Sequence, residues 1–238
     1  MHNFSVLSQC IDRGKITYGG DWGSTNFVHR CPTYSFAYGG DTSRNWNVLN
    51  DPIDISQVPK NILRLKQNID NRIKEFAGKE FFSMVKFNEV EVVYPNKLKA
   101  FIDSGRQDVT LKFCKAKYLF YYDFMPDSLM AYHIGVAVNS TSKIISQFTF
   151  PSKKEYKPIY TTFSYCKLIE IARQGQKDIE PIKEIKFEFD KKTKRFYWLI
   201  IQEIKNEKQG LNYYHQVIID ASDLKKAKVI KAKAYIDY

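Results

Sequence analysis

The hydrophobic and polar positions of this chain follow two periods, one of three to four residues and one of two. The helical period appears first over residues 61–82 and again over residues 165–174. In both segments charged residues separate the apolar positions, which are Ile62, Leu63, Leu65, Ile69, Ile73 and Phe76 in the first and Leu168, Ile169 and Ile171 in the second. This spacing predicts two amphipathic helices. Gly78 is expected to end or kink the first of them.

Segments with strand character follow each predicted helix. Alternating or short apolar runs, bounded by turn residues, are typical of strands. The first set comprises residues 85–93, 109–124, 131–138 and 144–150, with a short helix expected at 98–102, and the second set comprises 182–190, 195–203, 213–220 and 228–236. The order of one helix and then several strands therefore occurs twice.

The two halves also share a short sequence pattern. Tyr132-His133 opens an apolar run that ends at Asn139, and Tyr214-His215 opens another that ends at Asp220. We therefore predict an α+β fold of tandem helix-plus-antiparallel-sheet modules, over residues 59–155 and 156–238. Chance similarity between β-rich segments is the alternative explanation of the repeat.

Residues 1–58 form a third region, which is rich in glycine. Tyr18-Gly19-Gly20-Asp21 and Tyr38-Gly39-Gly40-Asp41 share the same four residue types, and each follows a β-prone run. Because Gly-Gly-Asp permits positive φ angles and caps turns, we predict a small N-terminal segment rich in β-hairpins. The same loops are an alternative phosphate or metal site, although no P-loop Lys-Ser/Thr follows and acidic ligands are few. The loop candidates are Asp21, Trp22, Asp41, Arg44 and Trp46.

Two segments of the second half resemble a known family. The segment from Arg195 to Leu199 contains three consecutive aromatic residues, and the segment from Val217 to Ser222 is an apolar run that reaches Asp220. They resemble the last strands of PepSY-like domains, in which a helix packs on a small antiparallel sheet and the final strand ends in Asp-x-x-x-Gly. Here residues 223–226 replace the turn that carries the glycine. The resemblance covers roughly the last 80 residues and, more faintly, the first copy. It implies a binding or inhibitory module, a class often found outside the cytoplasm.

Composition limits the class of protein. The chain is 44% hydrophobic and 15% aromatic, which is enough for a core. Its longest apolar runs are too short to cross a bilayer, and residues 1–11 lack the pattern of a secretory signal. Cys10, Cys31, Cys114 and Cys166 form no C-x-x-C pair and are interpreted as reduced thiols. We expect a cytoplasmic protein without membrane insertion.

Charge is the strongest compositional signal. The chain has 37 Lys and Arg against 26 Asp and Glu, a net charge of +11. This excess favours an acidic protein partner and is also compatible with nucleic acid. Two basic groups are the candidate partner-binding residues: Lys191, Lys192, Lys194 and Arg195, and then Lys225, Lys226, Lys231 and Lys233. Lysines at 231 and 233 are also explained as protection of an edge strand against aggregation.

Catalytic signatures are sparse. His133 and His215 precede apolar strands, where packing explains them, and no histidine lies in a metal-binding pair. The pairs Asp123 with Asp127 and Glu89 with Glu91 are candidates for acid–base chemistry only by their proximity in sequence. We predict no cofactor and no metal site. The favoured function is a cytosolic protein-binding module, such as an immunity or inhibitor protein. The alternatives are a basic nucleic-acid-binding protein and an enzyme of unrecognised type that uses Asp21 and Asp41.

Overall fold

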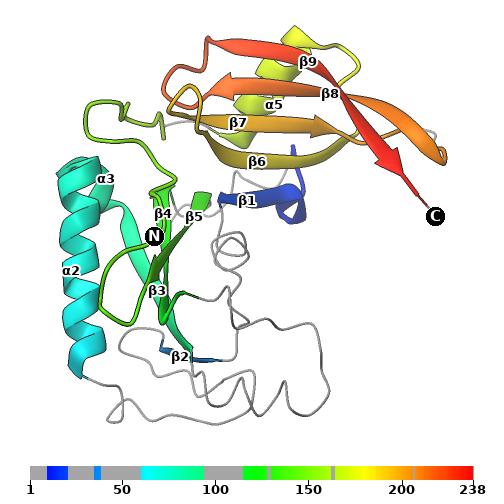
Figure 1. Ribbon diagram of the computed structural model, residues 1–238. Coiled ribbons are helices and arrows are strands. Elements are labelled where there is room, and N and C mark those ends of the chain that lie inside the picture. Colours follow the sequence, from blue (N-terminus) through cyan, green and yellow to red (C-terminus); the bar gives the residue numbers. More distant parts are fainter. Residues whose placement is uncertain are drawn as a thin grey trace, which may run out of the picture. The chain divides into compact units, whose positions relative to one another are not determined.

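The computed structural model describes residues 10–20, 35–38, 60–93, 115–127, 130–161, 164–205 and 207–237. These residues combine helices with β-strands, as the α+β prediction requires (Figure 1). The chain divides into two compact units. Unit 1 comprises Met1–Gly19, Pro126–Tyr132 and Glu155–Tyr238, and unit 2 comprises Gly20–Met125 and His133–Lys154. Tandem modules over 59–155 and 156–238 remain a prediction.

Unit 2 is a helix packed on a sheet. Helix α2 (Lys60–Ala77) is followed at Gly78, which has a φ of 90°, by the short α3 (Lys79–Ser83). The break falls where the sequence predicted it, because glycine adopts positive φ without steric cost. The strands are β2 (Ser35–Tyr38), β3 (Val85–Val93), β4 (Tyr118–Asp127) and β5 (Met130–Val138), in the order β2-β3-β4-β5.

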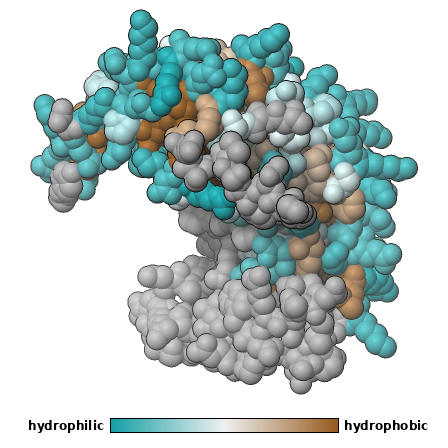
Figure 2. Space-filling view, turned by 180° about the vertical axis from the view of Figure 1, so that it is seen from behind, coloured by the Kyte–Doolittle hydropathy of each residue, from teal (hydrophilic) through white to brown (hydrophobic). Residues whose placement is uncertain are grey.

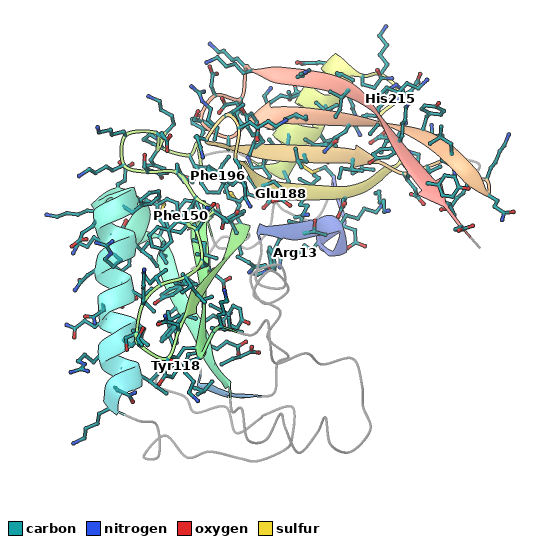
Figure 3. The ribbon with its side chains drawn as sticks, in the orientation of Figure 1. Arg13, Tyr118, Phe150, Glu188, Phe196 and His215 are labelled. Carbon is teal, nitrogen blue, oxygen red and sulfur yellow. A yellow bond between two sulfur atoms is a disulfide. The ribbon has the colours of Figure 1, made fainter. Side chains whose placement is uncertain are left out.

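The core of unit 2 lies between α2 and this sheet. The apolar stripe of α2 is buried, with Ile62, Leu65, Ile69, Ile73 and Ala77 at most 5% exposed. Phe81 of α3 stacks on Phe124 of β4 at 4.2 Å between ring centroids and on Phe150 at 5.2 Å. Phe150 is labelled in Figure 3. Burial of these apolar side chains stabilises the unit.

Unit 1 repeats the arrangement of one helix on a sheet. It contains the short 3-10 helix η1 (Arg13–Lys15), β1 (Ile16–Gly20) and α5 (Tyr165–Gly175). Four strands then form an antiparallel meander: β6 (Ile182–Asp190), β7 (Arg195–Gln202), β8 (Gly210–Asp220) and β9 (Ala227–Ile236). The order of the strands is β1-β6-β7-β8-β9.

Helix α5 covers one face of this meander. Its buried residues Leu168, Ile169 and Ala172 form one stripe, and the sheet buries Trp198 and Val217 with no exposed surface. Trp198 contacts Phe187 at 4.9 Å and the ring of Tyr165 at 5.7 Å. This face of the sheet is therefore the core of unit 1.

The glycine-rich N-terminal region departs from the prediction. Gly19 and Gly20, which we expected in a hairpin turn, lie within β1, and β1 pairs in parallel with β6. A Cβ atom on Gly19 would lie 1.9 Å from the carbonyl oxygen of Phe187. The glycine is therefore required for close approach of two backbones and not for a turn. Strand β2 pairs with β3, and the remainder of the predicted hairpins lies outside the described residues.

Two further predictions differ from the structure or lie outside it. Residues 144–150, expected as a strand, form only an isolated bridge between Val138 and Ile144 and are otherwise irregular. Phe150 there fills the end of the core of unit 2, so its apolar character reflects packing and not strand pairing. The short helix expected at 98–102 lies outside the described residues.

The interpretation of the cysteines as reduced thiols is wrong for two of the four. Cys10 and Cys166 form a disulfide with a Cα–Cα distance of 5.5 Å, and it joins the start of unit 1 to helix α5. Because the two cysteines are separated by 156 positions in the sequence, cysteine spacing did not indicate that they pair. Cys31 and Cys114 lie outside the described residues. None of the described helices has the length and apolarity needed to cross a membrane.

Candidate functional site

Strand β7 is apolar on both of its faces. Phe196, Trp198 and Ile200 are buried on the side of α5. Tyr197, Leu199 and Ile201 alternate with them and are only half-buried. Strands that are apolar on both sides are usually covered on both sides. In the described part of unit 1, a helix covers one side alone.

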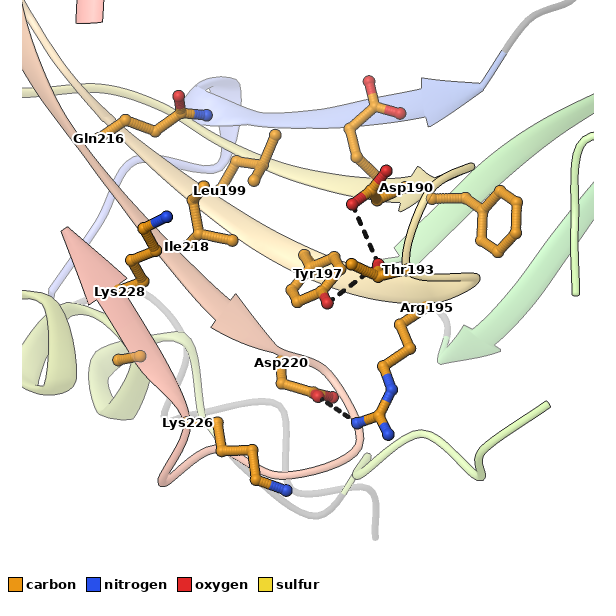
Figure 4. Close-up of a pocket in the computed structure, with 13 residues that line it drawn as sticks. Asp190, Thr193, Arg195, Tyr197, Leu199, Gln216, Ile218, Asp220, Lys226 and Lys228 are labelled. Atoms are coloured by element: carbon orange, nitrogen blue, oxygen red, sulfur yellow. Dashed lines mark hydrogen bonds and ion pairs between the residues drawn. The ribbon is translucent and has the colours of Figure 1, made fainter. Parts of the chain in front are cut away.

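We call the side of the β6–β9 meander that faces away from α5 the open face. Its centre is formed by cross-strand neighbours, since Leu199 pairs with Ile218 and Ile218 pairs with Lys228. A groove of about 990 Å³ crosses it (Figure 4). The lining residues include the apolar Leu199 and Ile218, and polar side chains surround them, among them Glu188, Arg195, Gln216 and Lys228. Figure 2 shows the opposite side of the molecule, from behind, where hydrophobic side chains reach the surface among hydrophilic ones.

The first basic group lies in the turn between β6 and β7, at one end of the groove. Asp190 organises this turn, because its carboxylate accepts hydrogen bonds from the backbone N–H of Lys192 at 2.8 Å and from the Thr193 hydroxyl at 3.0 Å. Lys194 closes the turn with a φ of 58°. Lys191, Lys192 and Lys194 are thereby exposed on a tight loop.

The second basic group is divided by the fold. Lys225 and Lys226 lie in the turn between β8 and β9, at the same end of the sheet as the first group, because alternate connections of a meander lie at the same end. Lys231 and Lys233 lie within β9 on the side of α5. Their ammonium groups lie 4.7 and 5.9 Å from the centre of the Tyr213 ring. The structure thus unites six of the eight predicted partner-binding residues and separates two.

An ion pair connects the two turns. Arg195 Nη1 lies 2.8 Å from Asp220 Oδ2, and the Asp220 carboxylate also accepts hydrogen bonds from the backbone N–H and hydroxyl of Ser222. Burial alone would raise the pKa of Asp220, but these hydrogen bonds and the Arg195 charge outweigh it and hold that pKa below its ordinary value. Asp220 is 4% exposed and remains ionised.

The end of the groove carries excess positive charge. Asp220 is matched by Arg195, and Asp223 is matched by Lys226 at 3.0 Å. Within the part of the chain that the structure describes, no carboxylate forms an ion pair with the other exposed lysines at this end. We call these lysines the basic end: Lys191, Lys192, Lys194, Lys225 and Lys228.

A separate polar cluster lies in unit 2. Asp123 accepts one hydrogen bond from the Asn88 amide at 3.1 Å, and its other carboxylate oxygen lies 2.7 Å from His133 Nδ1. The Tyr121 hydroxyl donates to the Glu91 carboxylate at 3.0 Å. Burial, opposed by this hydrogen bond and aided by the charge of Glu89, raises the pKa of Glu91 to about 7. Asp123 and Glu91 therefore contact different hydrogen-bonding groups, and within the second predicted pair the Glu89 charge acts on Glu91.

The remaining candidates are not placed. Asp21, Trp22, Asp41, Arg44 and Trp46 lie outside the described residues. Over the described residues, no group of three or more His, Cys, Asp or Glu side chains is arranged to hold a metal ion.

Sequence reasoning missed the centre of the open face. It read the run from Phe196 to Ile201 as a strand but did not assign its second face. The sequence did contain an indication of this second apolar face. In a sheet with one solvated side, alternate strand positions carry polar residues, but here those positions are Tyr197, Leu199 and Ile201.

Comparison of the chain with protein-family models, with curated protein sequences and with solved structures finds no match. The resemblance to PepSY-like domains therefore stays a prediction. The geometry of the open face and its basic end is what indicates a function.

Proposed function

We propose that this protein is a non-catalytic binding module that holds an acidic partner protein on the open face of unit 1, as an immunity or inhibitor protein does. One observation carries the proposal: β7 is apolar on both faces, and α5 covers only one. A partner seated on Leu199 and Ile218 would bury the second apolar face.

The layout of the open face supports a protein partner. Protein interfaces place an apolar centre inside a polar rim, with aromatic and arginine side chains enriched. Leu199 and Ile218 form such a centre, and Tyr197 and Arg195 lie beside it. Strands also hold side chains more rigidly than loops do, so less conformational entropy is lost when a partner binds.

The charge distribution supports an acidic partner. The basic end adds exposed lysines from two neighbouring turns to one margin of the groove. Such a field speeds the encounter with an acidic surface and orients it. The lysine-rich turns by themselves would also fit phosphate groups, which makes nucleic acid the second candidate. The apolar centre of the groove offers nothing to a phosphate backbone, so we place nucleic acid second.

The disulfide changes the proposed location. A disulfide between Cys10 and Cys166 is typical of proteins in oxidising compartments and rare in the cytosol. We therefore propose that the module works in an oxidising compartment and not in the cytoplasm predicted from the sequence. The PepSY-like resemblance implies the same location.

The test is capture of a partner by the immobilised protein from extract of the source cells, with nuclease and at two salt concentrations. We expect one stoichiometric protein that survives both treatments and is lost when Ile218→Glu places a charge in the groove. Leu211→Glu is the matched control, because Leu211 is exposed on β8 and alternates with the residues of the open face. Loss of the captured material on nuclease treatment, or equal capture by both variants, contradicts the proposal.

A further inference from the structure

Strand β9 is the last strand of the meander in unit 1. It has 10 residues, and all of them pair with β8 in one unbroken register from Ala227 with Ile219 to Ile236 with Gly210. No other strand of the described residues pairs with its second side. The outer edge of β9 is therefore a long, curved row of backbone groups (Figure 1).

The direction of these backbone groups follows from the turn. The N–H of Asp220 donates to the carbonyl oxygen of Lys226, so this pair is hydrogen-bonded, and hydrogen-bonded pairs recur at every second residue. The backbone groups of residues 228, 230, 232 and 234 thus point to β8. Those of Val229, Lys231, Lys233 and Tyr235 point outward. The N–H of His215, opposite Lys231, confirms the pattern, because it points away from β9 and donates to Gln202.

Natural edge strands are usually blocked by proline, bulges, short length or charged side chains. Strand β9 contains no proline, no bulge and no acidic residue, and only its lysines remain as protection. Lys231 and Lys233 reach across β8 to the Tyr213 ring, at 4.7 and 5.9 Å from its centre. Their charges therefore lie over the sheet and do not cover the outer edge.

We propose that the outer edge of β9 accepts an extended segment of the partner as an added strand, whose residues alternate between apolar and acidic. This inference rests on the proposed function and specifies how the partner is held. On the open face, such a strand lies beside Ile230, Ala232 and Ala234, which alternate with Lys231 and Lys233 along β9. On the other face its carboxylates lie beside Lys231 and Lys233. Backbone hydrogen bonds supply affinity, and the alternation supplies specificity.

The lysines also argue against a second copy of this chain as the occupant. Two β9 strands placed edge to edge would bring Lys231 and Lys233 of each copy onto the same face of one short ladder, with no acidic residue in either strand. Like charges on neighbouring strands destabilise their pairing. An acidic segment of another protein meets the same lysines with opposite charge.

The probe is a short synthetic peptide of alternating valine and glutamate, at neutral pH, with an alternating valine and lysine peptide as its control. Amide hydrogen exchange of the protein, followed by NMR, is the readout. We expect the acidic peptide to slow exchange about tenfold or more at Val229, Lys231 and Lys233, while residues 230 and 232 are protected already. The lysine peptide should leave exchange unchanged. Unchanged exchange with both peptides, or equal effects of both, overturns the proposal.

A pair of variants separates the contribution of the outward backbone N–H from that of the lysine charge. Lys233→Pro removes an outward N–H without removing a bond to β8, and Lys233→Ala removes only the charge. We expect the proline variant to bind the acidic peptide at least about tenfold more weakly than the alanine variant, with unchanged circular dichroism. Equal binding by the two variants overturns strand addition. If the wild type forms dimers at high concentration and Lys233→Pro abolishes them, a second copy of this chain occupies the edge of β9. That result also overturns the proposal.

These outcomes are separable from those of the proposed function. If a captured partner depends on Ile218 but binds Lys233→Pro normally, the open face is the interface and the added strand is wrong. If capture itself fails, the proposed function is wrong whatever the peptides do.

Discussion

Arg195 and Asp220 form a 2.8 Å ion pair between the first residue of β7 and the last residue of β8. Arg195 directly follows the first lysine-rich turn, and Asp220 directly precedes the second. The pair therefore holds the two turns next to each other, and Arg195 neutralises the Asp220 carboxylate, which then does not offset a nearby lysine. The positive field of the basic end depends on this arrangement.

Replacement of Asp220 should loosen the basic end. In Asp220→Asn the amide cannot accept all the hydrogen bonds that Ser222 and Arg195 donate to the carboxylate. We expect a loss of roughly 1–2 kcal/mol in the free energy of unfolding at neutral pH, measured by urea denaturation. Because the pKa of Asp220 is lowered in the folded protein, the stabilisation is present at neutral pH and is lost as the pH falls through that pKa. A deficit of unchanged size in strong acid would contradict this account.

Glu91 makes unit 2 sensitive to pH in the opposite sense. Its pKa rises from 4.5 to about 7 in the folded protein, mainly because of burial, so the folded state binds the proton more tightly than the unfolded state does. The stabilisation is complete below about pH 4.5 and is lost as the pH rises through about 7. The loss is on the order of 3 kcal/mol.

The variant Glu91→Gln should therefore remove this dependence. We expect it to match the wild type near pH 5 and to exceed it in stability near pH 8, by roughly 2–3 kcal/mol, in urea denaturation. Glu75→Gln is the control, because the Glu75 side chain is 67% exposed on α2. Parallel pH profiles for the wild type and Glu91→Gln would show that the Glu91 pKa is not raised.

The disulfide should contribute strongly to the stability of unit 1. The bond closes a loop across a sequence separation of 156, and loops of that size lose much chain entropy in the unfolded state. We expect the double variant Cys10→Ser, Cys166→Ser to lose roughly 2–4 kcal/mol in unfolding free energy. Reductant should destabilise the wild type by a similar amount and leave the double variant unaffected. Equal stability of the oxidised wild type and the double variant contradicts the prediction.

Charge reversal at the basic end should act on the rate of association. Replacing Lys191, Lys192 and Lys194 by Glu should slow binding of an acidic partner about tenfold at low salt, with little change in dissociation, because exposed charges mainly steer encounter. Surface plasmon resonance at two ionic strengths measures both rates. Lys205→Glu with Lys208→Glu is the control, since both residues lie in the connection between β7 and β8, at the other end of the sheet. Equal slowing by the two sets would show a general effect of net charge.

The sequence predicted helices and strands well wherever the spacing of the apolar residues and the position of the turn-forming residues agreed. The α2 stripe and its break at Gly78 are visible as spacing and composition, and so is the hairpin that begins at Asp190. Contacts between distant segments were not visible. The sequence around Gly19 predicts a turn, because it contains no sign that Phe187 approaches this residue in the fold. The Cys10–Cys166 disulfide could not be predicted for the same reason: its two residues lie far apart in the sequence.

The site was predicted in part for a similar reason. Lysines in turns are exposed whatever surrounds them, so Lys191, Lys192 and Lys225 could be proposed from the sequence. Leu199 and Ile218 could not, because an apolar residue in a strand is expected in the core until the cover of each face is known. The separation of Lys231 from the turn lysines likewise depends on the register between β8 and β9.

The most direct test of the binding module is methyl cross-saturation in the complex with the captured partner. The account predicts that saturation of the partner attenuates the methyl signals of Leu199 and Ile218 on the open face, while those of Leu168 and Ile169, on the buried side of α5, keep their intensity. Attenuation confined to methyl groups of α5, such as Ile171, with Leu199 and Ile218 unaffected, would contradict it and place the interface on the other side of unit 1.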